Sequence, residues 1–156
     1  LSGAILRDAW AEGLDLREAN LSDADLTRVV AGMHGIDFTG ANLCDAVAIG
    51  ADIIGTYTDA DLRRFDGRAA RLTGTFVRAR LDQADFRGSY LGLADFSGAV
   101  CGRVDFRGAG LRGANFTGAD LDGADFRGAD LSSASFGGAD TTGADLRGAD
   151  FSDTRW

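Results

Sequence analysis

Carboxylates are the most abundant side chains in this sequence that could take part in chemistry. The 156 residues include 24 Asp and Glu and 16 basic residues, all of them Arg, for a formal net charge of -8 at pH 7. This balance disfavours a general affinity for nucleic-acid phosphates and favours a basic partner or the imitation of a polyanion. The six carboxylates that we expect to contact a partner are Asp120, Asp122, Asp130, Asp140, Asp145 and Asp150.

The net charge varies along the chain. Residues 1–75 carry a net charge of -5, residues 76–113 carry +2, and residues 114–156 carry -5 with only three Arg. We expect Asp120, Asp122 and Asp140 to lie together on one face, and Asp130 and Asp150 on another. The final residues are therefore where we expect a partner to bind.

A second charge pattern has a structural interpretation. Asp85 and Arg87 recur at intervals of 20 residues, down to Asp145 and Arg147. Stacked Asp side chains repel one another, and an adjacent column of Arg relieves this through surface ion pairs, each worth under about 1 kcal/mol. We expect these columns to stabilise the fold.

Other reactive groups are sparse, and we expect neither an enzyme nor a cofactor or metal site. The single histidine, His34, stands beside Met33, and no nucleophile motif, phosphate loop or paired Cys/His spacing accompanies it. Cys44 and Cys101 fall on different kinds of position, so we predict no disulfide and a reduced, cytoplasmic setting. No apolar run approaches the roughly 18 residues that a membrane span needs, so we expect no membrane contact.

The element that positions these side chains is a five-residue repeat. From residue 76 onward a large apolar residue recurs at every fifth position with few exceptions, usually two residues after an Ala, and Gly often ends the unit, as in Ala119-Asp120-Leu121-Asp122-Gly123. A helix turns about 100° per residue, so this spacing would leave it without an apolar face. A strand alternates with a period of two, which five does not fit. A short three-residue strand followed by a corner satisfies the pattern, with Ala and Leu or Phe inward and Asp outward.

Four such sides close a square, and identities repeating at a spacing of 20 support this closure. The residues Phe76, Phe96, Phe116, Phe136 and Trp156 form one such series. We predict an all-β parallel solenoid of about eight 20-residue coils, forming one domain over residues 1–156. Two segments break the period, near residues 27–37 and 53–75, and we expect Val30, Met33 and His34 to lie on a small projecting loop.

The Ala-Asp-Leu/Phe-X-Gly units resemble those of the pentapeptide repeat family, over nearly the whole chain. The resemblance implies a right-handed quadrilateral β-helix, a handedness that the spacing alone does not supply. It also suggests a non-catalytic protein-interaction scaffold, the specific candidate being a B-DNA mimic that binds DNA gyrase or topoisomerase IV and inhibits it or protects it from quinolone-like poisons. It further suggests a homodimer formed through a coil end, where Phe151 and Trp156 lie. The alternatives are a structural or regulatory interaction module without DNA mimicry, or a fragment of a larger or consensus-designed repeat protein.

Overall fold

Each five-residue repeat forms one side and one corner of a square coil in the computed structural model, which describes residues 1–156. Ala79 and Leu81 are fully buried, whereas Arg80 between them is exposed. At the corners, Gly88 has a φ of 63°, in the left-handed region that glycine enters at little cost. The expected alternation of inward and outward residues is therefore present.

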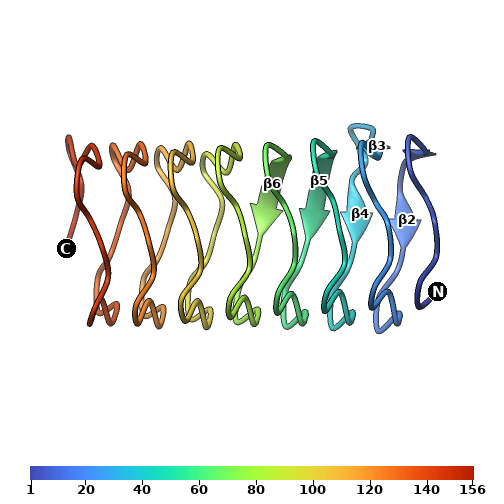
Figure 1. Cartoon of the computed structure of the whole chain (residues 1–156), viewed down its shortest axis with the longest axis horizontal. Coiled ribbons are helices and arrows are strands. Elements are labelled where there is room, and N and C mark those ends of the chain that lie inside the picture. The colour runs from blue at the N-terminus through green and yellow to red at the C-terminus, as the bar shows by residue number, and fades with distance from the viewer.

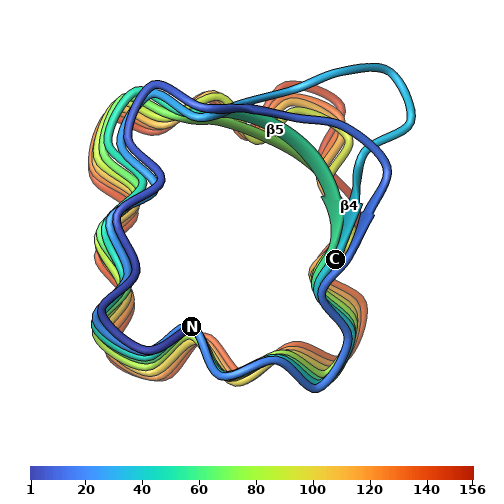
Figure 2. The ribbon, with the colours of Figure 1, turned by 90° about the vertical axis from the view of Figure 1, so that its right-hand side faces the viewer.

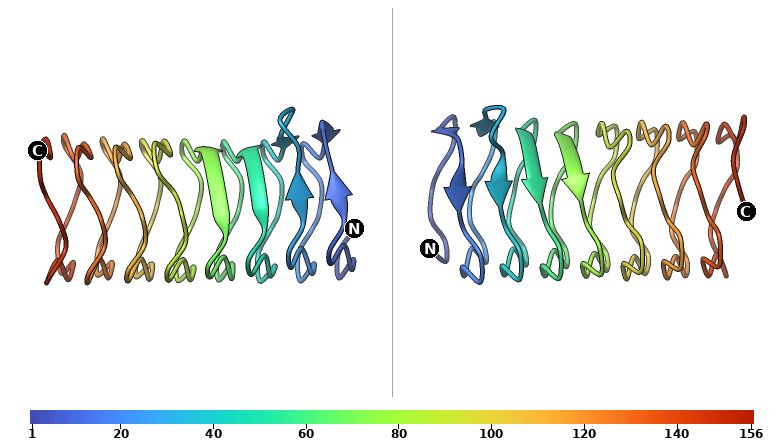
Figure 3. Two further views of the ribbon diagram at one scale, coloured as in Figure 1. Left: turned by 90° about the horizontal axis from the view of Figure 1, so that it is seen from above. Right: turned by 180° about the vertical axis from the view of Figure 1, so that it is seen from behind.

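The coils stack into a straight rod with the two termini at opposite ends (Figures 1 and 3). Viewed from the N-terminal end in Figure 2, the chain runs clockwise as it recedes, so the coil is right-handed. Parallel bridges join each coil to the next along every side, and one column passes through eight coils: Ile5, Asp25, Val47, Asp66, Asp85, Asp105, Asp125 and Asp145. These features confirm the right-handed quadrilateral parallel β-helix.

Few sides are long enough to count as strands. The six strands are β1 (Trp10–Ala11), β2 (Leu14–Asp15), β3 (Val30–Ala31), β4 (Ile36–Asp37), β5 (Asp52–Thr56) and β6 (Arg71–Thr75). They form one parallel sheet in the order β1-β3-β5-β4-β2, with β6 paired to β5. Elsewhere a single bridged residue represents each side, shorter than the three-residue strands that the repeat predicts, because the corners take up the remaining positions.

The core consists of stacked columns of identical side chains. Phe96 and Phe116 stack with ring centroids 5.0 Å apart and an interplanar angle of 4°. Their column continues from Phe136 to Trp156 at one end and from Phe76 to Tyr57 at the other. A second column, which includes Phe106 and Phe126, meets the first edge-on. The 20-residue spacing seen in the sequence therefore corresponds to direct ring contact.

Tyr57 is a member of the first column that the repeat pattern did not reveal. Its ring stacks on Phe76 at 4.4 Å and it is buried, but its hydroxyl has no hydrogen-bond partner. Burial raises the pKa of this phenol. An unpartnered buried hydroxyl costs about 1–3 kcal/mol.

We expect Tyr57→Phe to raise the free energy of unfolding by about 1 kcal/mol, because the variant removes the orphaned hydroxyl and leaves the ring stack intact. Urea unfolding followed by circular dichroism measures the change. A loss of stability in Tyr57→Phe would show that the hydroxyl has a partner after all.

The two irregular segments change the length of individual coils. Asn20 pairs with Asn42, 22 residues on, whereas Asn42 pairs with Asp61 and Asp61 with Arg80, each 19 residues on. The extra residues form a loop between β3 and β4 that extends beyond the square (Figure 2). The missing ones remove a corner, which β5 and β6 cut as continuous strands.

Candidate protein-interaction surfaces

The six predicted carboxylates lie on three of the four sides of the rod. We name the sides by their outward columns: the Asp120 side, which includes Asp140; the ladder side, which includes Asp145; and the Asp130 side, which includes Asp150. The fourth, aromatic side carries Phe76 and Phe96 inward. Because the sides follow one another around the coil in the order aromatic, Asp120, ladder and Asp130, the Asp120 and Asp130 sides face in opposite directions.

These outward Asp residues have a structural task at the corners. The Oδ1 atom of Asp120 accepts the backbone N–H of Asp122 at 3.1 Å, and Asp140 accepts that of Thr142 at 2.9 Å. This is an Asx turn, which satisfies a corner amide. Asn42 and Asn115 make the same bond through their side-chain oxygens. The turn therefore needs the oxygen and not the negative charge.

The ladder side carries an alternating lattice of Asp and Arg. Arg107 lies 2.6 Å from Asp105 in its own coil and 3.6 Å from Asp125 in the next, through Nη2 and Nε respectively. The pattern continues through Arg127 and Asp145. The side-chain hydrogen bond from Arg147 lowers the pKa of Asp145 to about 2. Asp145 is thus compensated by Arg on this side and is set apart from the other five predicted carboxylates.

We expect the free energy of unfolding to decrease as the pH falls from about 4 toward 2. The pKa of Asp145 is about 2 in the folded protein and 3.8 in its absence of contacts, and that of Asp125 is also lowered. The unfolded chain therefore takes up protons first, and stabilisation that is complete above the unfolded pKa is lost as the pH falls through the folded one. Urea unfolding at several pH values measures this. Asp125→Asn/Asp145→Asn, which keeps the turns, should show a shallower slope, and an identical slope would contradict the role of the ladder.

The other carboxylates of the last coils have no such compensation. Asp120, Asp122 and Asp140 are exposed, and each lies more than 4.0 Å from every Arg. Asp130 and Asp150 on the opposite side are likewise exposed and unpaired with Arg, although they accept hydrogen bonds from Ser132 and Ser152. The acidic character inferred for the chain end is thus concentrated on two opposite sides.

The projecting loop is held by a single side-chain pair. Met33 is 89% exposed at its tip, and Val30 precedes it in β3. His34 Nδ1 lies 2.6 Å from Oε1 of Glu12 in the first coil, and this hydrogen bond lowers the pKa of Glu12. His34 thus serves as an anchor for the loop and makes no contact with a nucleophile.

The C-terminal coil presents an aromatic surface. Trp156 is 64% exposed and stacks on Phe136 at 4.9 Å, with Phe151 tilted beside it at 5.7 Å. Both cysteines are free thiols. No group of three His, Cys, Asp or Glu side chains is arranged to hold a metal ion, and none of the chain forms a helix with the length and apolarity to cross a membrane.

Eight copies of the pentapeptide repeat model match this sequence, over residues 1–30, 76–113, 109–148 and 124–155. These matches cover more than half of the chain, which therefore belongs to the pentapeptide repeat family. No curated protein sequence matches it.

Solved structures of the same family resemble the rod along most of its length. HetL, a pentapeptide repeat protein involved in heterocyst differentiation regulation from the cyanobacterium Nostoc sp. strain PCC 7120, is 27% identical, with 98% of this chain and 87% of HetL covered at a TM-score of 0.50. A trypsin-treated form of QnrB1, a plasmid-mediated fluoroquinolone resistance protein, is 21% identical, with 99% of this chain and 83% of QnrB1 covered at a TM-score of 0.57. The likeness to QnrB1 shows a shared fold.

Proposed function

We propose that this protein is a non-catalytic scaffold that presents the carboxylates of its last coils to a basic surface of a protein partner. The observation that carries the proposal is the contrast between two neighbouring sides. On the ladder side each Asp from Asp85 to Asp145 has an Arg within 4.0 Å, whereas Asp120, Asp122 and Asp140 have none. Uncompensated charge on a rigid surface steers and selects an oppositely charged partner.

The specific partner that we propose is the DNA-binding surface of a type II topoisomerase, DNA gyrase or topoisomerase IV. Asp120 and Asp140 lie one coil apart, at the usual strand spacing of about 4.8 Å. B-DNA carries one charge per about 1.7 Å of its axis, so the protein imitates duplex DNA at a lower charge density. We therefore expect moderate, strongly salt-dependent binding that inhibits the enzyme or protects it from quinolone-like poisons. The shared fold with QnrB1, a fluoroquinolone resistance protein, is consistent with this role.

A regulatory interaction module without DNA mimicry is the second candidate. It draws support from HetL, which is involved in heterocyst differentiation regulation and is 27% identical to this chain. In this case the rod presents its surfaces to a partner unrelated to DNA metabolism.

We further propose a cytoplasmic setting, in keeping with the two free thiols, and a homodimer joined through the C-terminal coil. Trp156 and Phe151 would supply the apolar contact at that coil end. Light scattering decides the second point, since a monomer mass at micromolar concentration would exclude such a dimer.

A supercoiling assay with purified DNA gyrase tests the main proposal. We expect Asp120→Asn/Asp122→Asn/Asp140→Asn to raise the concentration for half-maximal effect at least about tenfold, a loss of about 1.4 kcal/mol in binding. Asn preserves the Asx turns, as Asn42 and Asn115 do, so only charge is removed.

The matched control is Asp23→Asn, which removes an equally unpaired charge from the second coil and should change the effect less than about twofold. No effect of the wild-type protein on gyrase or topoisomerase IV at micromolar concentration would exclude the topoisomerase partner. An unchanged effect in the triple variant would exclude mimicry through the Asp120 side.

A further inference from the structure

The corner between the Asp130 side and the aromatic side is recessed in two coils and raised in the coils around them. In the third and fourth coils this corner is absent, because β5 and β6 cross it as straight strands. The loop between β3 and β4 extends past them on one flank, and the regular corner returns at Leu93 on the other (Figure 2). Two strands at about 4.8 Å spacing give the recess a width of about 10 Å.

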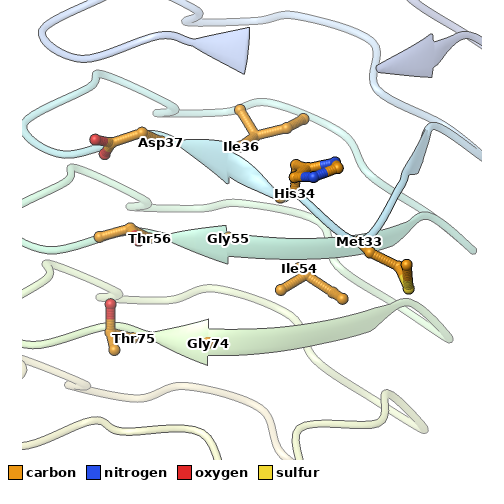
Figure 4. Close-up of a pocket in the computed structure, with 10 residues that line it drawn as sticks. Met33, His34, Ile36, Asp37, Ile54, Gly55, Thr56, Gly74 and Thr75 are labelled. Carbon is orange, nitrogen blue, oxygen red and sulfur yellow. The ribbon is translucent and has the colours of Figure 1, made fainter. Parts of the chain in front are cut away.

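A groove of about 300 Å³ occupies this recess and opens to solvent (Figure 4). Its floor is the backbone of Gly55 and Gly74, which pair directly in β5 and β6. Met33 and Ile54 form one edge, and both are exposed apolar side chains. Seven of the eleven large hydrophobic residues that are exposed lie on or beside this corner: Trp10, Leu14, Val30, Met33, Ile54, Tyr90 and Leu93. Such a concentration on one part of a surface marks an interaction site.

The loop that forms the wall of the groove is preformed. Its turn is closed by the backbone hydrogen bond from Gly35 to Gly32, and Gly13 donates to the Gly35 carbonyl from the first coil. The hydrogen bond between His34 and Glu12 adds a side-chain anchor. A wall that is already ordered does not have to be fixed when a ligand binds, which favours affinity.

The opposite edge of the groove is polar and acidic. One column of bridged residues forms it, in which Thr56 and Thr75 stand between Asp37 and Asp95. Unlike Thr39, whose hydroxyl donates to Asp37, Thr56 and Thr75 have hydroxyls without a partner in the protein. Asp95 has no Arg within 4.0 Å, and Asp37 has only a distant contact with Arg17 at 3.8 Å. This edge offers hydrogen bonds to a peptide backbone and negative charge to a basic side chain.

We propose that this groove binds a short peptide segment of a partner protein, one that carries large apolar residues and a basic residue. The apolar residues pack on Met33 and Ile54, and the basic residue lies toward Asp37 or Asp95. The acidic edge disfavours an anionic ligand such as nucleic acid or an acidic lipid surface. The site lies in the N-terminal half of the rod, away from the carboxylates of the last coils, and it does not depend on the function proposed for them.

Selection from a random 12-residue peptide library displayed on phage tests this inference. The wild-type protein is the target, and Met33→Gln/Ile54→Thr is used for counter-selection. Both substitutions are at exposed positions, and Thr73 already occupies the place in β6 that corresponds to Ile54, so the fold should persist. Val100→Thr, which alters an exposed apolar residue on the Asp120 side, is the matched control.

The expected result is enrichment of peptides that combine at least two large apolar residues with Lys or Arg. A synthetic peptide of that sequence should bind the double variant at least about tenfold more weakly, and Val100→Thr within about twofold of wild type. Asp37→Asn/Asp95→Asn, which keeps the corner turns, should weaken the same peptide. Failure to enrich any peptide that distinguishes wild type from the double variant would overturn the proposal, and so would enrichment of acidic peptides or equal weakening by Val100→Thr.

Discussion

Replacing Gly74 by alanine is expected to cost at least about 3 kcal/mol of the free energy of unfolding. Gly74 has a φ of 138°, which L-residues rarely adopt. A Cβ atom built on it would lie 1.9 Å from the backbone carbonyl oxygen of Gly55, far inside contact distance. Relieving this overlap requires β5 and β6 to separate where Gly55 and Gly74 pair. The variant should therefore lose the floor of the groove as well as stability.

Gly88→Ala is the control for this prediction. Gly88 has an ordinary left-handed φ of 63°, and a Cβ there meets no atom within 4 Å. Non-glycine residues such as Arg78 and Gln83 adopt the same conformation at equivalent corners. We expect a loss of about 1–2 kcal/mol. Urea unfolding monitored by far-ultraviolet circular dichroism compares the two variants, and equal losses would show that the contact between β5 and β6 is not what selects glycine at residue 74.

Phe106→Ala is expected to destabilise the rod by about 3–5 kcal/mol. The Phe106 ring contacts four others, stacking between Phe86 and Phe126 and meeting Phe96 and Phe116 edge-on. Its removal leaves a cavity at the middle of both aromatic columns. Because each coil of a solenoid is stabilised mainly by its neighbours, the damage falls at the junction between the two halves of the rod.

Phe106→Leu provides the comparison. Leu26 and Leu146 occupy the same inward column, so a leucine fits the backbone there, and we expect a loss below about 1.5 kcal/mol. Thermal and urea unfolding measure both variants. If alanine and leucine cost the same, the loss would arise from the ring contacts and not from the cavity.

The charge pattern illustrates how far the sequence alone could predict the candidate site. Reading residues at intervals of 20 correctly placed Asp120 and Asp140 in one column and Asp130 and Asp150 in another. It did not reveal that the turns at these positions use the Asp oxygens, which depends on side-chain rotamers. Nor did it show that Asp145 is the member of the set compensated by Arg127 and Arg147, although its ladder motif is visible in the sequence.

The irregular segments limited the prediction in a different way. The sequence shows that two residues are added and two are lost between Leu26 and Phe76. It does not show that both losses fall at one corner, in consecutive coils, beside the loop. Tyr57 was missed for the same reason, because it lies four residues after Ile53 and breaks the interval of five.

The sequence by itself determined the repeat, the square coil, the direction of each side chain and the family. It could do so because every coil places the same residue types in the same local surroundings, so a period in the sequence is a period in space. Tertiary structure decided which charges are compensated, how the loop is anchored, and where the groove lies. These features depend on how coils of 22 and 19 residues align with their neighbours, and that alignment is set by packing and hydrogen bonding across coils, not by any local interval.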